Sequence, residues 1–211
     1  MVAIIDYKAG NLTSVRLAAE AVGASVRVTS DPADILSAER IVFPGVGAAA
    51  AAMENLGRLG LADAIRRAVA AGVPFIGICL GAQILFDRSD EDGGTQTLGI
   101  LPGRVLRLAP PDPRAKIPHM GWNQAAFKKP HPVLDGIADG SDFYFVHSYY
   151  MAPEQEGDIL AETDFAGQTF VSAVARGNIV ATQFHIEKSG KTGLRWLANF
   201  MKWDGREAAP C

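Results

Sequence analysis

The chain has 211 residues, of which 48% are hydrophobic and 20% are charged, and its formal net charge is −3 at pH 7. This composition is ordinary for a globular protein, and the length suits one domain over residues 1–203 with a short tail over 204–211. There is no Lys- or Arg-rich block, no apolar run of about 20 residues and no leader-like N-terminus, so we expect no nucleic-acid or membrane partner and a cytoplasmic location.

Short apolar runs alternate with helical patterns through the first half of the chain. Strands are predicted at 2–5, 25–28, 40–43 and 73–78, and helices at 11–22, after Asp31-Pro32, at 59–70 and at 80–86. Strands separated by helices pair in parallel through right-handed crossovers, and uniformly apolar strands are buried on both faces. The sequence therefore predicts an α/β fold, with an open, mostly parallel, doubly wound sheet and helices on both faces.

The second half of the chain is predicted to add an antiparallel region to this sheet. Strand patterns occur at 105–108, 143–146, 170–175 and 179–183, with little helix between them. The tight turn Arg176-Gly177-Asn178 joins the last two strands and predicts a hairpin. A final helix is predicted from about Thr192 to Lys202.

One of the two cysteines stands where a strand is predicted to meet a helix. The segment FIGICLGAQ (75–83) places Cys79 between Gly77 and Gly81. This spacing is the thiol counterpart of the G-x-S-x-G nucleophile elbow, in which small neighbours tolerate a strained turn. A helix N-terminus also favours a thiolate. Free cysteine is otherwise a common packing residue, so this segment alone leaves a structural and a catalytic role open.

A nucleophilic cysteine needs a general base, and the base needs an orienting partner. His185 and Glu187 follow the strand predicted at 179–183 and are separated by one residue. Phe184 and Ile186 alternate with this polar pair, so His185 and Glu187 are expected to face the same side. A carboxylate in that position orients the imidazole and stabilises its charged form. The pattern favours this joint role over a solvated Glu187.

Backbone amides near the cysteine are candidates for binding an oxyanion. The Leu80 amide follows the nucleophile directly. The loop Gly45-Val46-Gly47 follows the third predicted strand, at the carboxyl edge of the sheet where α/β proteins bind ligands. Taken alone, this loop also fits an ordinary glycine turn. The His and Cys residues lack the spacing of metal ligands, so we expect no metal site.

With these residues in view, the chain resembles the class I (triad) glutamine amidotransferases. The matching segments are GICLGAQ (77–83), HSYY (147–150) and QFHIEKSG (183–190). A narrower resemblance, to the glutaminase subunits of imidazole glycerol phosphate synthase in histidine biosynthesis, adds DYKAGNL (6–12), FPGVGA (43–48), IPHMGWN (117–123) and FYFVHSYY (143–150). One departure is Ile186, where the family usually has Pro. Because Ile can adopt the backbone angle that Pro fixes, we expect the triad geometry to persist.

The resemblance implies that a Cys79–His185–Glu187 triad hydrolyses glutamine to glutamate and ammonia without a cofactor. It also implies substrate contacts from Gln83, Ser148 and Tyr149. The expected partner is a (β/α)8-barrel cyclase subunit, in a heterodimer, that uses the ammonia to make imidazole glycerol phosphate and aminoimidazole carboxamide ribotide. The residues expected to face this partner are His119, Met120, Trp122, Asn123 and Lys188.

Two further expectations concern this partner. The oxyanion loop at 45–47 is expected to stay misaligned until the partner and its ligand dock. Trp122 could instead pack in the core.

Three other functions stay open at this point. The chain could serve another class I amidotransferase, such as one in pyridoxal phosphate, anthranilate or purine synthesis, which would share the triad and differ only in its acceptor partner. It could be a cysteine hydrolase or chaperone-like protein of similar fold. It could also be a non-catalytic binding subunit, although the presence of Cys79, His185 and Glu187 argues against that function.

Overall fold

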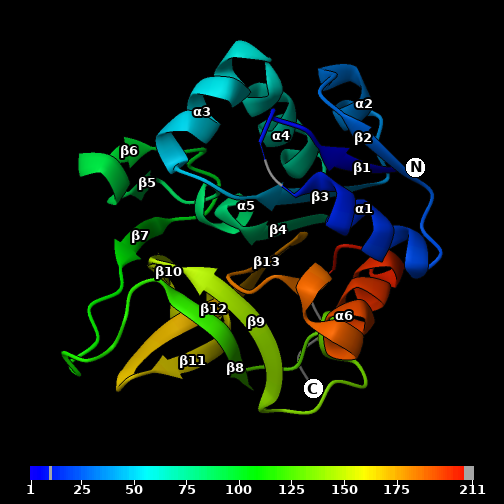
Figure 1. The fold of residues 1–211 in the computed structure, drawn as a ribbon. Helices are drawn as coiled ribbons and strands as arrows, with labels where there is room; N and C mark the ends of the chain where they lie inside the picture. Colours follow the sequence, from blue (N-terminus) through cyan, green and yellow to red (C-terminus); the bar gives the residue numbers. More distant parts are fainter. Residues whose placement is uncertain (10, 207–211) are drawn as a thin grey trace.

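The parallel half of a mixed β-sheet forms the centre of the molecule (Figure 1). The computed structural model describes residues 1–9 and 11–206, so Gly10 and most of the predicted tail over 204–211 lie outside it. The central strands lie in the order β2 (Val26–Thr29), β1 (Val2–Ile5), β3 (Arg40–Gly45), β4 (Phe75–Cys79) and β13 (Ile179–Thr182). All neighbours in this set pair in parallel, which confirms the predicted doubly wound arrangement.

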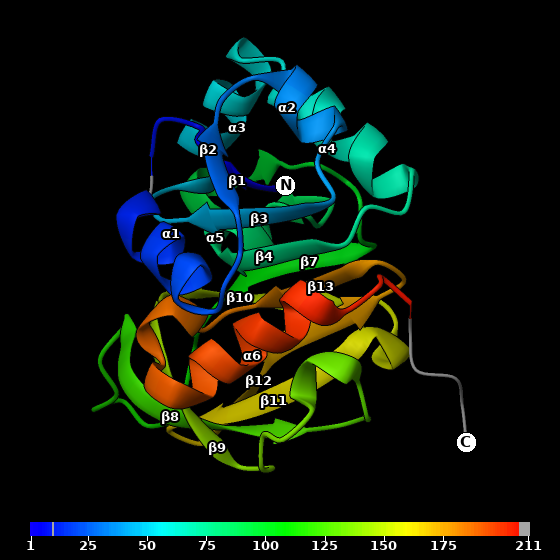
Figure 2. The ribbon, with the colours of Figure 1, turned by 90° about the vertical axis from the view of Figure 1, so that its right-hand side faces the viewer.

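Helices cover both faces of these strands, as Figures 1 and 2 show. On one face lie α2 (Pro32–Leu36), α3 (Ala49–Arg58) and α4 (Leu61–Ala70), and on the other lie α1 (Leu12–Ala21) and α6 (Gly190–Lys202). The strands serve both faces because consecutive side chains point in opposite directions. Ile41 and Phe43 enter the hydrophobic cluster with α2–α4, whereas Val42 enters the cluster with α1 and α6.

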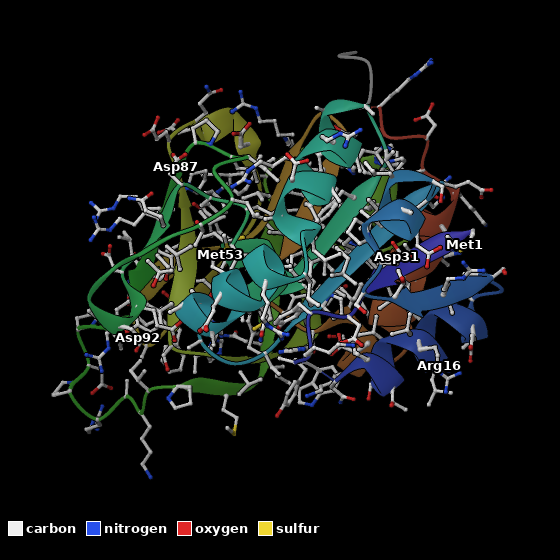
Figure 3. The ribbon with its side chains drawn as sticks, turned by 90° about the horizontal axis from the view of Figure 1, so that it is seen from above. Met1, Arg16, Asp31, Met53, Asp87 and Asp92 are labelled. Atoms are coloured by element: carbon white, nitrogen blue, oxygen red, sulfur yellow. The ribbon has the colours of Figure 1, made fainter. Side chains whose placement is uncertain are left out.

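The antiparallel half of the sheet begins at β13. β13 forms the predicted hairpin with β12 (Gln168–Arg176), in which Arg176 lies opposite Ile179. The sheet continues through β10 (Tyr149–Pro153), β7 (Gly103–Arg107), β5 (Arg88–Ser89) and β6 (Thr95–Gln96), while β11 (Ile159–Phe165), β8 (His119–Phe127) and β9 (Ser141–His147) branch from β12. In the view from above, Asp87 and Asp92 lie at the opposite end of the molecule from Met1, Arg16 and Asp31 (Figure 3).

Two helices differ from the predictions. α3 was not predicted from the sequence, although its buried residues Ala49, Ala52 and Leu56 have helical spacing. The helix predicted at 80–86 is only α5 (Leu80–Gln83). The helix does not continue over residues 84–86, because their carbonyl groups accept hydrogen bonds from the N–H groups of residues 98–101 and not from the next helical turn.

Five strands in this half of the sheet were not predicted from the sequence: β5, β6, β8, β10 and β11. β8 has side chains that alternate between more buried and more exposed positions, but Gly121 interrupts the strand pattern in its sequence. Short 3-10 helices complete the described fold at Glu91–Gly93 (η1), Pro132–Leu134 (η2), Glu156–Asp158 (η3) and Ile186–Lys188 (η4).

Candidate active site

Cys79 occupies a strained turn between β4 and α5. Its backbone has φ 54° and ψ −112°, a region that residues other than glycine rarely adopt. Close packing holds this turn against β3. A Cβ atom on Gly81 would lie 2.0 Å from the Phe43 carbonyl oxygen, and one on Gly77 would lie 2.6 Å from the Gly81 carbonyl oxygen. Only glycine fits at these two positions, so the prediction of a sharp elbow with small neighbours is confirmed.

His185 and Glu187 form a buried pair next to this turn. His185 Nδ1 lies 2.8 Å from Glu187 Oε1, and the two side chains are 3% and 2% exposed. His185 lies just beyond the end of β13 and has an extended backbone, with φ −87° and ψ 97°. Residues that precede proline are also restricted to extended conformations, so His185 keeps an extended backbone although Ile186 stands where the family usually has Pro. The buried Ile186 side chain also contributes to the hydrophobic cluster that contains Cys79.

The electrostatics of His185 favour its protonated form. Burial lowers the pKa of the imidazole, but hydrogen bonding and charge attraction to Cys79 and Glu187 outweigh burial and raise it to about 10. The Nε2 atom, on the ring edge opposite Glu187, is buried without a hydrogen bond of standard geometry among the described residues. His185 is therefore placed to hold a proton taken from Cys79 and to donate it later.

A pocket opens beside Cys79 at the carboxyl edge of the sheet. It is lined by Val46, Gly47, Cys79, Leu80, Gln83, Glu91, Pro118, Val146, His147, Ser148, Tyr149 and His185. The structure thus brings the predicted nucleophile, base, oxyanion loop and substrate contacts together around one space. Glu91 was not among the predicted residues. Its carboxylate accepts a hydrogen bond from the Ala49 N–H at 2.7 Å, and burial raises its pKa.

Two glutamine amides lie beside the thiol. Gln83 Nε2 donates to the Tyr149 carbonyl at 2.8 Å and to Gln183 Oε1 at 3.0 Å. Gln183 Nε2 lies 3.6 Å from Cys79 Sγ. The Oε1 atom of Gln83 makes no hydrogen bond within residues 1–9 and 11–206, which leaves it available to a ligand. In the sequence, Gln183 belongs to the segment QFHIEKSG (183–190), and no role was predicted for its side chain.

The Val46 backbone, predicted to supply an oxyanion donor, is engaged elsewhere. Its N–H donates to Tyr7 Oη at 3.1 Å, and Tyr7 Oη donates to the Val46 carbonyl at 3.1 Å. Burial raises the pKa of Tyr7 to about 12, so its hydroxyl stays protonated. Leu80, by contrast, opens α5, and first-turn N–H groups have no partner within their own helix.

A pair of buried histidines extends from the pocket. His147 Nδ1 donates to the Tyr149 carbonyl at 2.9 Å, so its Nε2 accepts from His119 Nδ1 at 3.0 Å. His119 Nε2 then accepts from Asn123 Nδ2 at 3.3 Å. Burial lowers the pKa of His119 to about 4 and that of His147 to about 3, so both imidazoles stay neutral at pH 7.

The residues predicted to face a partner divide into two groups. Met120 and Trp122 are 64% and 58% exposed, and Lys188 is exposed as well. Trp122 stands edge-on to Tyr144 at 6.1 Å, and Lys188 Nζ lies 5.8 Å from the centre of the same ring. Trp122 is therefore not a core residue.

His119 and Asn123 correct the prediction of a partner face. His119 is 3% exposed and stacks between Phe145 and Phe165. Asn123 is half-buried, and its Nδ2 also donates to the Asp164 carbonyl. Because these two side chains make contacts inside the protein, they are not part of the exposed surface that Met120, Trp122 and Lys188 form.

Comparison with known proteins identifies the family. A family model described as glutamine amidotransferase class-I matches residues 3–203. The imidazole glycerol phosphate synthase subunit HisH of Aromatoleum aromaticum is 51% identical over 210 residues, which cover 96% of this chain and 98% of the relative. The chain belongs to the HisH family of class I glutamine amidotransferases. The HisH subunit of Chromobacterium violaceum is 49% identical over 97% of this chain and 98% of its own length.

Solved structures share the fold of this HisH family member at lower identity. A glutamine amidotransferase superimposes with a TM-score of 0.74 at 18% identity, over 95% of this chain and 97% of the other. PurLQS from Thermotoga maritima superimposes with a TM-score of 0.69 at 17% identity, over 95% and 97%. Within the part of the chain that the structure describes, no helix has both the length and the apolarity to cross a bilayer.

Proposed function

We propose that this HisH family member is the glutaminase subunit of imidazole glycerol phosphate synthase and supplies ammonia to a (β/α)8-barrel cyclase subunit. The observation that carries this proposal is the buried Cys79–His185–Glu187 cluster beside a ligand-sized pocket. Identity of about 50% to HisH subunits over nearly the whole chain supports the choice of complex. Because Cys79 must stay a free thiol to react, we place the protein in the cytoplasm, where thiols are kept reduced.

In this mechanism Cys79 attacks the side-chain carboxamide carbon of glutamine. His185, oriented by Glu187, takes the thiol proton and donates it to the departing ammonia, which leaves a thioester on Sγ. Water then attacks the thioester with His185 as base, and glutamate leaves as the C–S bond breaks. The raised pKa of His185 supports this assignment, since the imidazolium form is stabilised between Cys79 and Glu187.

The substrate contacts follow from the groups that line the pocket. Gln83 offers Oε1 as an acceptor for an N–H group of glutamine, because both hydrogens of its Nε2 are used inside the protein. Ser148 and Tyr149 line the same space and offer polar groups to the amino-acid end. Glu91 places a carboxylate in the pocket, which suits the α-ammonium group of glutamine.

The oxyanion is proposed to bind the Leu80 N–H and one N–H of the Gly45-Val46-Gly47 loop. The hydrogen bond from Val46 to Tyr7 supports the expectation that this loop is not aligned in the free subunit, because the amide cannot serve Tyr7 and an oxyanion together. One oxyanion donor contributes roughly 100- to 1,000-fold to the rate. Docking of the loaded cyclase is proposed to release this amide, which couples glutamine hydrolysis to the need for ammonia.

The exposed Met120, Trp122 and Lys188 are proposed to contact the cyclase. Exposed apolar and aromatic side chains beside a pocket are typical of protein interfaces. Val46 is also 39% exposed at the mouth of the pocket, so a partner there would reach the oxyanion loop directly. Such a contact would also shield the released ammonia from solvent.

The test measures glutamate release from glutamine by the chain alone, with the cyclase subunit, and with the cyclase plus its nucleotide ligand. The proposal expects strong activation only in the loaded complex and complete loss in Cys79→Ala. Equal activity in all three mixtures would assign the triad to another amidotransferase or to a free-standing glutaminase. No activity in any mixture would contradict the glutaminase function itself.

A further inference from the structure

The side chain of Gln183 makes a contact with the nucleophile that the mechanism above does not use. Gln183 directly follows β13, where its N–H donates to the Ser172 carbonyl at 2.8 Å. Its side chain is fully buried at 0% exposure, and Nε2 lies 3.6 Å from Cys79 Sγ. The larger radius of sulfur makes this distance normal for an N–H donor to sulfur. The contact joins β13 to the elbow after β4, its parallel neighbour in the sheet.

Neighbouring hydrogen bonds fix the orientation of the Gln183 amide. The Tyr149 carbonyl can only accept, so Gln83 must direct Nε2 toward it, at 2.8 Å. The second hydrogen of Gln83 Nε2 then meets Gln183 Oε1 at 3.0 Å. If the Gln183 amide were reversed, two NH2 groups would face each other. Gln183 therefore directs its own N–H toward Cys79, because Oε1 is held on the other side.

His147 also binds the Tyr149 carbonyl, the first group in this chain of hydrogen bonds. Its Nδ1 donates to the same Tyr149 carbonyl at 2.9 Å, so this oxygen accepts from two side chains at once. The lowered pKa of His147 keeps the ring neutral, so it places no positive charge beside Cys79. The Tyr149 carbonyl thus fixes the orientation of the Gln83 amide, which fixes that of the Gln183 amide, whose N–H is directed at the Cys79 sulfur.

We infer that Gln183 is a catalytic residue that stabilises the Cys79 thiolate through its Nε2–H, with Gln83 as the residue that positions it. This inference rests on the proposed function. A neutral donor adds to the imidazolium of His185 without competing for its proton, and water does not reach this buried amide. A hydrogen bond to an anion is roughly twice as strong as one between neutral groups. The effect is therefore largest when Sγ carries charge.

The same donor acts a second time, when the thioester is hydrolysed. The C–S bond breaks, its electron pair returns to Sγ, and the thiolate leaves as glutamate forms. A thioester sulfur is a weak acceptor, whereas the departing thiolate is a strong one. Gln183 therefore binds the transition state of this step more tightly than the thioester, which is the condition for an interaction to accelerate a reaction.

The experiment replaces Gln183 by Met, which keeps the side-chain length and removes the donor. Gln96→Met, on the exposed face of β6, is the matched control, and all variants carry Cys211→Ser so that Cys79 is the only thiol. The rate of Cys79 alkylation by iodoacetamide is measured across a pH series. We expect Gln183→Met to shift the midpoint of this profile upward by about one pH unit, which makes alkylation tenfold slower at pH values below the midpoint and leaves the plateau at high pH unchanged.

The other titratable groups around the thiol and its pocket are His185 with its partner Glu187, His147, Tyr149, Glu91 and Tyr7, and Gln183→Met leaves all of them in place. An unchanged midpoint in Gln183→Met, or an equal shift in Gln96→Met, would overturn the inference. Alkylation reports the thiolate without glutamine turnover. A chain that alkylates normally but releases no glutamate would contradict the proposed function and leave this inference standing.

A second measurement uses the chain with an intact Gln183, in case Gln183→Met does not fold. The side-chain amide resonances of Gln183 are followed by NMR across the same pH series. We expect the Nε2 proton to shift with the midpoint of Cys79 alkylation and to stay constant in Cys79→Ala. A resonance that does not respond to the ionisation of Cys79 would overturn the inference.

Discussion

The close approach of α5 to β3 makes Gly81 the most sensitive position of the elbow. A Cβ atom there would lie 2.0 Å from the Phe43 carbonyl oxygen and 2.9 Å from the Phe43 carbonyl carbon. Real Cβ atoms essentially never come within 3.0 Å of such atoms, so β3 and α5 would have to separate by about 1 Å. Both contacts are with backbone, and Phe43 itself is fully buried, so no flexible side chain can absorb the movement.

We expect Gly81→Ala to lower the free energy of unfolding by about 3 kcal/mol, at the upper end of overpacking costs in well-packed cores. For a chain of this size that loss corresponds to about 6–12 °C in Tm. Gly57→Ala is the matched control, because Gly57 lies exposed in α3 and a Cβ there would meet nothing within 4 Å. This control should gain about 0.5–1 kcal/mol, since alanine favours a helix more than glycine does.

Urea unfolding of both variants, followed by circular dichroism, gives the two free energies. Alkylation of Cys79 by iodoacetamide then tests the elbow itself, because a displaced α5 would move the sulfur away from His185. If Gly81→Ala unfolds at the same urea concentration as the parent chain and alkylates at the same rate, the tight packing between β3 and α5 does not control the elbow. A change in the free energy of unfolding equal to that of Gly57→Ala would refute the reasoning as well.

Three further predictions concern the site. Glu187→Gln should reduce glutamine hydrolysis by the loaded complex by about 100- to 10,000-fold with little change in KM, because the base loses its orienting charge. Tyr7→Phe frees the Val46 amide and should raise glutamate release by the chain alone by up to about 100-fold. The pKa values of His119 and His147 are lowered in the folded chain, so between about pH 6.5 and pH 4 only the unfolded chain binds a proton at these residues. The free energy of unfolding should therefore decrease as the pH falls through this range, by at most about 3 kcal/mol for His119.

Each of these predictions has an outcome that would contradict it. Near-normal turnover in Glu187→Gln would show that the Glu187 carboxylate is not needed to orient the base. Unchanged basal activity in Tyr7→Phe would mean that the hydrogen bond to Val46 does not restrain the oxyanion loop. For the histidine pair, urea unfolding of His119→Gln should depend less on pH between about 6.5 and 4 than unfolding of the parent chain, and equal slopes would refute the assignment.

The core of the fold and the sharp turn at Cys79 could be predicted from the sequence alone. Apolar strands separated by amphipathic helices can bury both faces only in a parallel, helix-covered sheet, and the structure has that arrangement from β1 to β4. The glycines that flank Cys79 predict the elbow because their requirement is steric and local. The position of His185 and Glu187 just beyond a strand end also followed from the sequence, since alternation along an extended chain fixes which side chains share a face.

Tertiary structure decided what depends on contacts between distant segments. α5 ends at Gln83 because residues 98–101 supply the hydrogen bonds that would otherwise extend the helix. The sequence does not reveal that His119 is buried between two phenylalanines of other strands, and it was therefore predicted on the partner face. The contacts of Tyr7 with Val46 and of Gln183 with Cys79 join residues 39 and 104 positions apart. Local patterns specify which residues can react, whereas the packing of the sheet specifies which distant groups hold them in place.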